Sequence, residues 1–156
     1  MKSILAIVFA GIIGLPAAAD DTLNTPPPPP ETGVILDGSN IDLSQFVWIK
    51  RPLVVFADSP ADPRFVQQME MLNARLDDLA VRDVVVLTDT DPAAQGPLRE
   101  RLRPRGFMLA LIAKDGTVSL RKPLPWDVRE ISRSIDKLPM RQQEIKERRE
   151  SANPAS

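Results

Sequence analysis

Cysteine and histidine are both absent from the 156 residues of the chain. Thiol-disulfide exchange proceeds by attack of a thiolate, so the absence of cysteine excludes that chemistry. Zinc and haem sites built from His and Cys ligands are excluded for the same reason. Any bound metal would be a hard cation held by carboxylates, and we expect no cofactor.

The chain also lacks an excess of charge of either sign. It carries 20 Lys and Arg against 21 Asp and Glu, a formal net charge of -1. A protein that binds nucleic acid or an anionic membrane surface usually shows a basic stripe or a polybasic run. We therefore expect neither nucleic acid nor a membrane surface as a partner.

The N-terminus has the three-part layout of a secretory signal peptide. Lys2 supplies a positive charge, residues 4–15 form an apolar stretch, and Pro16 precedes Ala17-Ala18-Ala19. A transmembrane anchor is the alternative, but it needs roughly 20 apolar residues and this stretch is shorter. We predict a signal peptide over residues 1–19, cleavage after Ala19, no stable membrane insertion afterwards, and a periplasmic or secreted protein.

Residues 20–38 are predicted to be a proline-rich linker. Pro26 to Pro30 are five consecutive prolines, which lack N–H donors and favour an extended polyproline II rod. We interpret this rod as a spacer between the signal peptide and a folded domain. The alternative interpretation is a ligand for an aromatic-lined groove.

Hydrophobic patterning predicts one domain over residues 39–141. Residues 41–49 indicate a short strand or turn, and the unbroken apolar run at 53–57 indicates a strand buried on both faces. Two prolines and two aspartates then predict a turn at 58–63 and a helix from Pro63 to about Ala80. Its apolar stripe recurs at spacings of four and three residues: Phe65, Met69, Leu72, Leu76 and Leu79.

The second half of this domain repeats the alternation. Residues 84–87 indicate a buried strand parallel to the first, and residues 93–102 a short helix delayed or kinked at Gly96-Pro97. Residues 107–113 and 117–121 indicate two strands joined by a hairpin turn at Asp115-Gly116. A last helix is expected over 126–138. We predict a charged, partly disordered tail over 142–156. The alternating charges of residues 140–150 are typical of a solvated helix face, and the alternative is a docking strip.

The order β-α-β-α-β-β-α, with a mixed central sheet flanked by helices, resembles the thioredoxin-like α/β fold. Several segments are similar to an exported bacterial family known as domain of unknown function 4174 (DUF4174). The resemblance covers residues 42–141 and is carried by Leu53 to Ala57, Asp62-Pro63-Arg64, Leu72-Asn73, Arg82 to Val86, Gly106-Phe107, Leu111 to Gly116 and Asp136 to Arg141. It implies the fold and no assigned activity.

Departures from redox-active thioredoxins carry chemical meaning. The resemblance places their C-x-x-C motif at Asp58 to Pro63, and their cis-proline at Met108. A cis bond before a residue other than proline costs about 2.5–4 kcal/mol, so we expect a trans bond before Met108. Ser59 could be considered as a nucleophile, but no histidine is present to activate it, which favours a turn or capping role.

Four aspartates follow the first two buried strands, namely Asp58, Asp62, Asp89 and Asp91. The carboxyl ends of adjacent parallel strands meet at one edge, where open α/β sheets bind ligands. These carboxylates are therefore candidates for a Ca²⁺ or Mg²⁺ site or for general acid-base work. The other interpretation is that Asp58 and Asp62 cap the first helix while Asp89 and Asp91 cap the second.

These observations favour an exported, non-redox thioredoxin-like domain of unknown specific function. Its expected role is to bind or scaffold another protein of the cell envelope. A carboxylate-based enzyme or a divalent-cation-binding protein that uses the acidic strand ends is the alternative.

Overall fold

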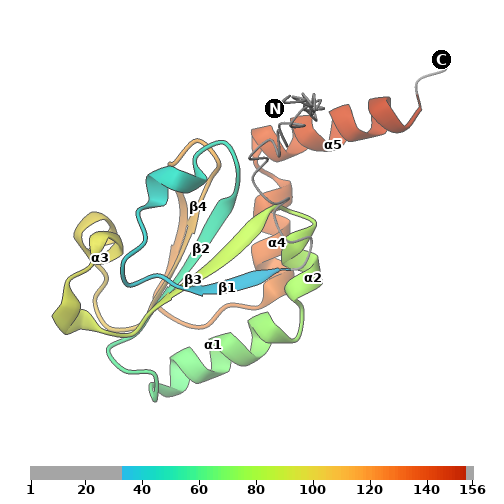
Figure 1. The fold of residues 1–156 in the computed structure, drawn as a ribbon. Coiled ribbons are helices and arrows are strands. Elements are labelled where there is room, and N and C mark those ends of the chain that lie inside the picture. Colours follow the sequence, from blue (N-terminus) through green and yellow to red (C-terminus); the bar gives the residue numbers. More distant parts are fainter. Residues whose placement is uncertain (1–32, 154–156) are drawn as a thin grey trace, which may run out of the picture.

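The computed structural model describes residues 33–153, which form a five-stranded mixed sheet flanked by helices (Figure 1). The strand order is β1-β3-β2-β4-β5. β1 and β3 are parallel to each other, as are β2 and β3, whereas β4 is antiparallel to both β2 and β5. The strands are β1 (Val34–Asp37), β2 (Arg51–Phe56), β3 (Val84–Asp89), β4 (Met108–Ile112) and β5 (Val118–Lys122). The predicted thioredoxin-like fold class is confirmed.

The three central strands are apolar on both faces, so each strand contributes to two cores. Leu53 and Val55 of β2 face α1 (Pro63–Asn73), α2 (Leu76–Ala80) and α4 (Val128–Asp136). Val54 and Phe56 face the opposite side, which is covered by α3 (Pro97–Leu102) and the short 3-10 helix η1 (Leu43–Phe46). Burial on both sides is what the unbroken apolar runs predict.

The helix expected over 63–80 is two helices. α1 ends at Asn73, and the chain adopts a non-helical conformation at Arg75, with φ -141° and ψ 37°, before α2 begins. Leu72 and Leu79 nevertheless pack into the same core. The apolar stripe continues across the break, and no glycine or proline marks it, so periodicity alone predicts one helix.

The delayed helix at Gly96-Pro97 is confirmed. Pro92–Ala94 form the 3-10 helix η2, Gln95 takes a left-handed conformation, and α3 begins at Pro97. Proline is favoured at a helix start because a backbone N–H at that position would have no partner within the helix. A Cβ on Gly96 would lie 2.1 Å from the carbonyl oxygen of Ser39, so only glycine fits this close approach.

Two predicted boundaries differ from the structure. The end of the proposed linker contains β1, which pairs with β3 from Val34 to Asp37. At the other terminus α5 (Pro139–Ala152) occupies most of the segment expected to be a partly disordered tail. Ion pairs to residues outside the helix fix the start of α5, including the pair between Arg141 and Asp136 at the end of α4. The signal peptide and the proline run lie outside the described residues.

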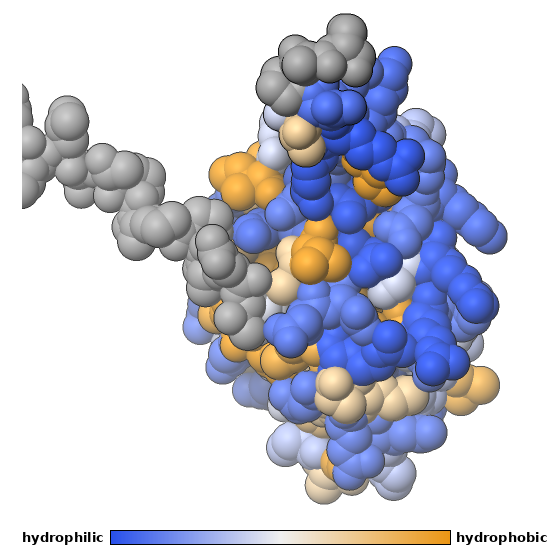
Figure 2. Space-filling model, turned by 90° about the vertical axis from the view of Figure 1, so that its right-hand side faces the viewer, coloured by the Kyte–Doolittle hydropathy of each residue, from blue (hydrophilic) through white to orange (hydrophobic). Residues whose placement is uncertain are grey.

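No helix within residues 33–153 is long and apolar enough to cross a membrane. The face that carries α4 and α5 is largely hydrophilic, with apolar side chains in small separate groups (Figure 2). The exposed apolar side chains are dispersed over several elements of the described fold: Leu36, Trp48, Ile49, Val66, Val81, Val118 and Leu124.

Candidate functional site

The carboxyl ends of β2 and β3 form one edge of the sheet, as the sequence predicts. Phe56 is in register with Asp89 on the parallel strand β3 and with Met108 on the antiparallel strand β4. The turn after β2 therefore lies beside the residues that enter β4. A Cβ on Gly106 would lie 3.9 Å from both Asp58 Oδ2 and Arg64 Nη2, which places these two side chains against that loop.

Asp89 is held in a buried ion pair at this edge. It is 2% exposed, and Arg99 Nε of α3 donates to its Oδ1 over 2.9 Å. Arg99 Nη2 also donates to the carbonyl oxygens of Ala57 and Asp89 at 2.8 and 3.1 Å, and its guanidinium lies over the Phe56 ring. Asp89 thus fixes α3 to the strand ends and does not cap the following helix.

The other three candidate aspartates cap helices or are exposed. Asp62 caps α1 by accepting a hydrogen bond from the Arg64 amide and also pairs with the Arg64 side chain, which lowers the pKa of Asp62. Asp91 caps η2. Capping is therefore confirmed for Asp62 and Asp91, whereas Asp58 is exposed and α1 is capped by Asp62. Residues 33–153 contain no group of three acidic side chains placed to hold a metal.

Ser59 has the turn role that the sequence favours. Its Oγ accepts a hydrogen bond from the Ala61 amide at 3.1 Å, and its carbonyl oxygen accepts one from the Asp62 amide. Met108 is preceded by a trans bond, since the described part of the chain contains no cis peptide. The turn at 58–63 is an acid- and proline-rich support for α1.

A basic pocket of about 270 Å³ opens next to this turn. Its cationic side chains come from the loop before β4 and from the end of β5, and its apolar surface is formed around the entry to β4. We call it the basic pocket and define it by its lining residues: Arg103, Arg105, Phe107, Met108, Arg121, Lys122 and Pro123. None of its four cations forms an ion pair within residues 33–153.

Two of these cations are fixed by contacts other than ion pairs. Arg121 Nη1 donates to the carbonyl oxygen of Leu102 at 2.6 Å and contacts the sulfur of Met108 at 3.8 Å. Lys122 Nζ lies 4.5 Å from the centre of the Trp126 ring, a cation–π arrangement. The loop that presents the other two includes left-handed conformations at Arg103 and Gly106. The pocket thus has ordered positive charge with unused donors.

The basic pocket is not among the candidate sites drawn from the sequence. The signal that could have found it is the run of arginines at every second position from 99 to 105, together with Arg121-Lys122. Overall charge balance hides it, because the net charge of the chain is -1. Register brings the two basic segments together, since Lys122 pairs with Leu109 at the start of β4.

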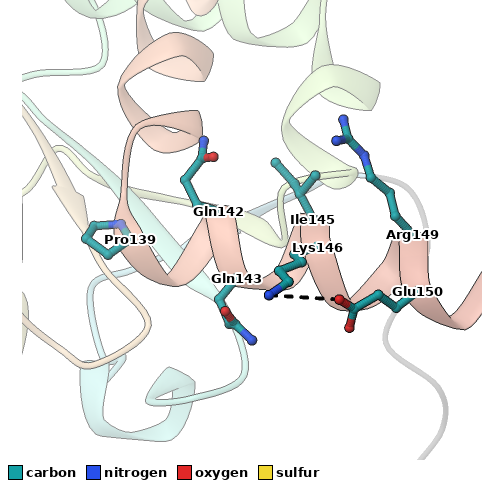
Figure 3. Close-up of a pocket in the computed structure, with 7 residues that line it drawn as sticks. All are labelled: Pro139, Gln142, Gln143, Ile145, Lys146, Arg149 and Glu150. Carbon is teal, nitrogen blue, oxygen red and sulfur yellow. Dashed lines mark ion pairs between the residues drawn. The ribbon is translucent and has the colours of Figure 1, made fainter.

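A second hollow, of about 560 Å³, lies along α5 (Figure 3). The described residues that line it all belong to this one helix, and they include the exposed ion pair between Lys146 and Glu150. Alternating charges on one helix face are typical of a solvated surface. This hollow adds no convergent set of functional groups to the described structure.

Comparison with one solved structure supports the fold. The chain is similar to the reduced 2-Cys peroxiredoxin of Plasmodium vivax, with 16% identity, a TM-score of 0.55, and coverage of 66% of this chain and 85% of that one. It also matches thioredoxin peroxidase I of Plasmodium yoelii at 20% identity and a TM-score of 0.48, covering 66% and 80% of the two chains. The first likeness concerns the fold alone, because the cysteines in that protein's name have no counterpart here.

No curated protein matches the sequence. The family model for Domain of unknown function (DUF4174) matches residues 42–144. This match includes the buried residues of both cores, the turn at 58–63 and the basic pocket. It also includes every strand of the sheet apart from β1. The chain is therefore a member of the DUF4174 family, an uncharacterised thioredoxin-like domain that in this protein has no cysteine.

Proposed function

We propose that the protein is an exported, non-redox binding module of the cell envelope. It engages another envelope protein through the edge formed by the turn at 58–63, the loop before β4 and the end of β5. The observation that carries the proposal is the combination found at this edge. An open basic pocket, whose cations have no acidic partner among residues 33–153, lies beside a turn that lacks the cysteines of thiol chemistry.

The chemistry of the edge favours binding over catalysis. Asp62 and Asp89 are occupied by arginine partners, and Ser59 is occupied by the turn. A general acid or base needs a pKa near the working pH, but the contacts of Asp62 lower its pKa. In contrast, the basic pocket presents donors that an incoming anionic group can use without breaking an ion pair of the fold.

Support for export comes from the sequence of residues 1–19, with its single charge, apolar stretch and small residues before the cleavage position. The proline run that follows would hold the folded domain away from whatever the N-terminus of the mature chain contacts. A small domain without disulfides folds equally well in an oxidising compartment, because it has no thiols to mispair.

Site-specific photo-crosslinking in the host cell tests this proposal. A photoreactive amino acid at Ala61 or Pro123, both exposed at the edge, should give one discrete adduct in the envelope fraction. The same amino acid at Glu147 or Arg148, exposed on α5, is the matched control and should give none. The intact mass of the recovered chain should equal that of a chain that begins at Asp20. No adduct from the edge, equal adducts from both faces, or an uncleaved cytoplasmic chain would contradict the proposal.

A further inference from the structure

We propose that the basic pocket receives an aspartate or glutamate side chain, flanked by an apolar residue, from an acidic segment of the partner protein. This inference rests on the proposed function and specifies the chemistry of its ligand. It follows from the charges of the pocket, their fixed positions, its apolar surface and the charge of the rest of the chain.

The first step concerns charge. Arg103, Arg105, Arg121 and Lys122 surround one small pocket, and none has an acidic partner within residues 33–153. Elsewhere in the fold the arginines next to strand ends are paired, as Arg99 is with Asp89 and Arg51 with Glu144. A guanidinium presents a planar fork of donors that matches a carboxylate in a bidentate geometry. Three such forks meet at the pocket.

The second step concerns order. The bond from Arg121 to the carbonyl oxygen of Leu102 and the stacking of Lys122 on Trp126 hold these two cations before any ligand arrives. Preorganised donors lose less side-chain entropy on binding than mobile ones do. The side chains of Arg103 and Arg105 are exposed and form no hydrogen bond or ion pair within residues 33–153, so they remain available to close on the ligand.

The third step concerns shape. The pocket also contains Phe107, Met108 and Pro123, so its cations are arranged around apolar surface. Met108 is partly exposed at the entry to β4, where methionine can adapt to differently shaped apolar groups. A volume of about 270 Å³ suits one or two side chains. An acidic side chain with an apolar neighbour satisfies both kinds of surface.

The fourth step concerns the class of partner. Because the full chain carries a net charge of -1, the residues outside the four pocket cations together carry a net charge of -5. A long polyanion such as nucleic acid would meet this repulsion beyond the pocket, whereas a short acidic segment would not. The charge is therefore local and suits recognition of a single group on a protein chain.

Fluorescence titration of the mature protein tests the inference. The chain has two tryptophans, so Trp48→Phe leaves Trp126, which stacks on Lys122, as the reporter. The probe is a short peptide of alternating Asp and Leu, and its comparison peptide replaces every Asp with Asn. The acidic peptide should change Trp126 emission in a saturable manner, and the Asn peptide should bind roughly tenfold or more weakly.

The variant pair separates the pocket from general charge. Arg103→Gln with Arg105→Gln removes two pocket cations, and Arg148→Gln with Arg149→Gln removes two cations from α5 as the matched control. The pocket variant should bind the acidic peptide at least about tenfold more weakly, with the control unchanged. Equal weakening by both pairs, equal binding of both peptides, or displacement of the peptide by stoichiometric inorganic phosphate would overturn the inference.

Failure of the inference is distinguishable from failure of the proposed function. If the edge crosslinks to one envelope protein but the acidic peptide does not bind, the module binds its partner by other contacts and the acidic ligand is wrong. If the peptide binds but no edge-specific adduct forms in the cell, the pocket has the proposed chemistry and the protein-binding role is wrong.

Discussion

Arg51 Nη2, at the start of β2, lies 2.8 Å from Glu144 Oε1 on α5, a contact between residues 93 positions apart. Arg51 is fully buried, and Lys114 Nζ of the β4–β5 turn also lies 2.8 Å from the same carboxylate oxygen. Glu144 therefore joins the sheet, the hairpin and the last helix at the end opposite the basic pocket. This junction ties the two ends of the sequence together, whereas the cations of the basic pocket form no ion pair within residues 33–153.

Glu144→Gln should lower the free energy of unfolding at neutral pH by about 2–3 kcal/mol, because it leaves Arg51 buried without a counter-charge. Chemical denaturation monitored by circular dichroism measures this change. Glu147→Gln, on the exposed face of the same helix, is the control and should change stability by less than about 0.5 kcal/mol. Similar values for the two variants would refute a stabilising role for the junction.

The loss of stability at acidic pH should depend on Glu144. Burial favours a raised pKa for Glu144, but hydrogen bonds and charge from Arg51 and Lys114 outweigh it and lower the pKa from 4.5 to about 2. A carboxylate with a lowered pKa stabilises the fold fully above its ordinary pKa, and this contribution is lost as the pH falls toward 2. Thermal melts between pH 5 and pH 2 should thus fall more steeply for the native chain than for Glu144→Gln. Parallel curves would contradict this assignment.

Arg99→Ala should destabilise the protein by about 3–5 kcal/mol, because Asp89 would remain buried without its only ion-pair partner in the described structure. The carbonyl oxygen of Ala57 would also lose a donor, which should loosen the turn after β2. Arg101→Ala on the same helix removes one exposed hydrogen bond to Gly116 and should cost less than about 1 kcal/mol. Equal losses of unfolding free energy for the two variants in denaturant titrations would show that the Asp89–Arg99 pair does not contribute more stability than an exposed hydrogen bond.

Sequence patterning predicts the elements whose signal is local. The apolar run of β2, the Asp-Gly turn after β4 and the helix start at Pro97 all lie where they are expected. The order of elements also predicts that β2 and β3 are parallel neighbours, so that Asp58 and Asp89 follow or end their strands at the same edge of the sheet.

The remaining features depend on contacts between distant residues, which a single sequence does not reveal. β1 has only four residues, and its pairing with β3 decides its structure. The sequence of α5 is that of a charged tail, and its order depends on the ion pairs of Glu144 with the distant residues Arg51 and Lys114. The partner of Asp89 is likewise hidden, because Arg99 reads as one of several surface arginines in a short helix.

Calcium or magnesium should not raise the thermal midpoint of the protein. Asp62 and Asp89 already have arginine partners, and a cation would have to displace a guanidinium to bind either carboxylate. Differential scanning fluorimetry across a series of each cation checks this, with potassium at equal ionic strength as the control. A saturable increase that disappears in both Asp58→Ala and Asp89→Ala would instead establish the acidic edge as a cation site.

Quantitative capture from envelope extract tests the central claim most directly. The mature chain, tagged at its C-terminus, should recover one partner protein reproducibly, and Arg103→Gln with Arg105→Gln should reduce the recovery at least about tenfold. Arg148→Gln with Arg149→Gln should recover as much partner as the native chain. A partner that is retained equally by both variants, or no reproducible partner at all, would contradict the claim that this cysteine-free edge is a protein-binding site.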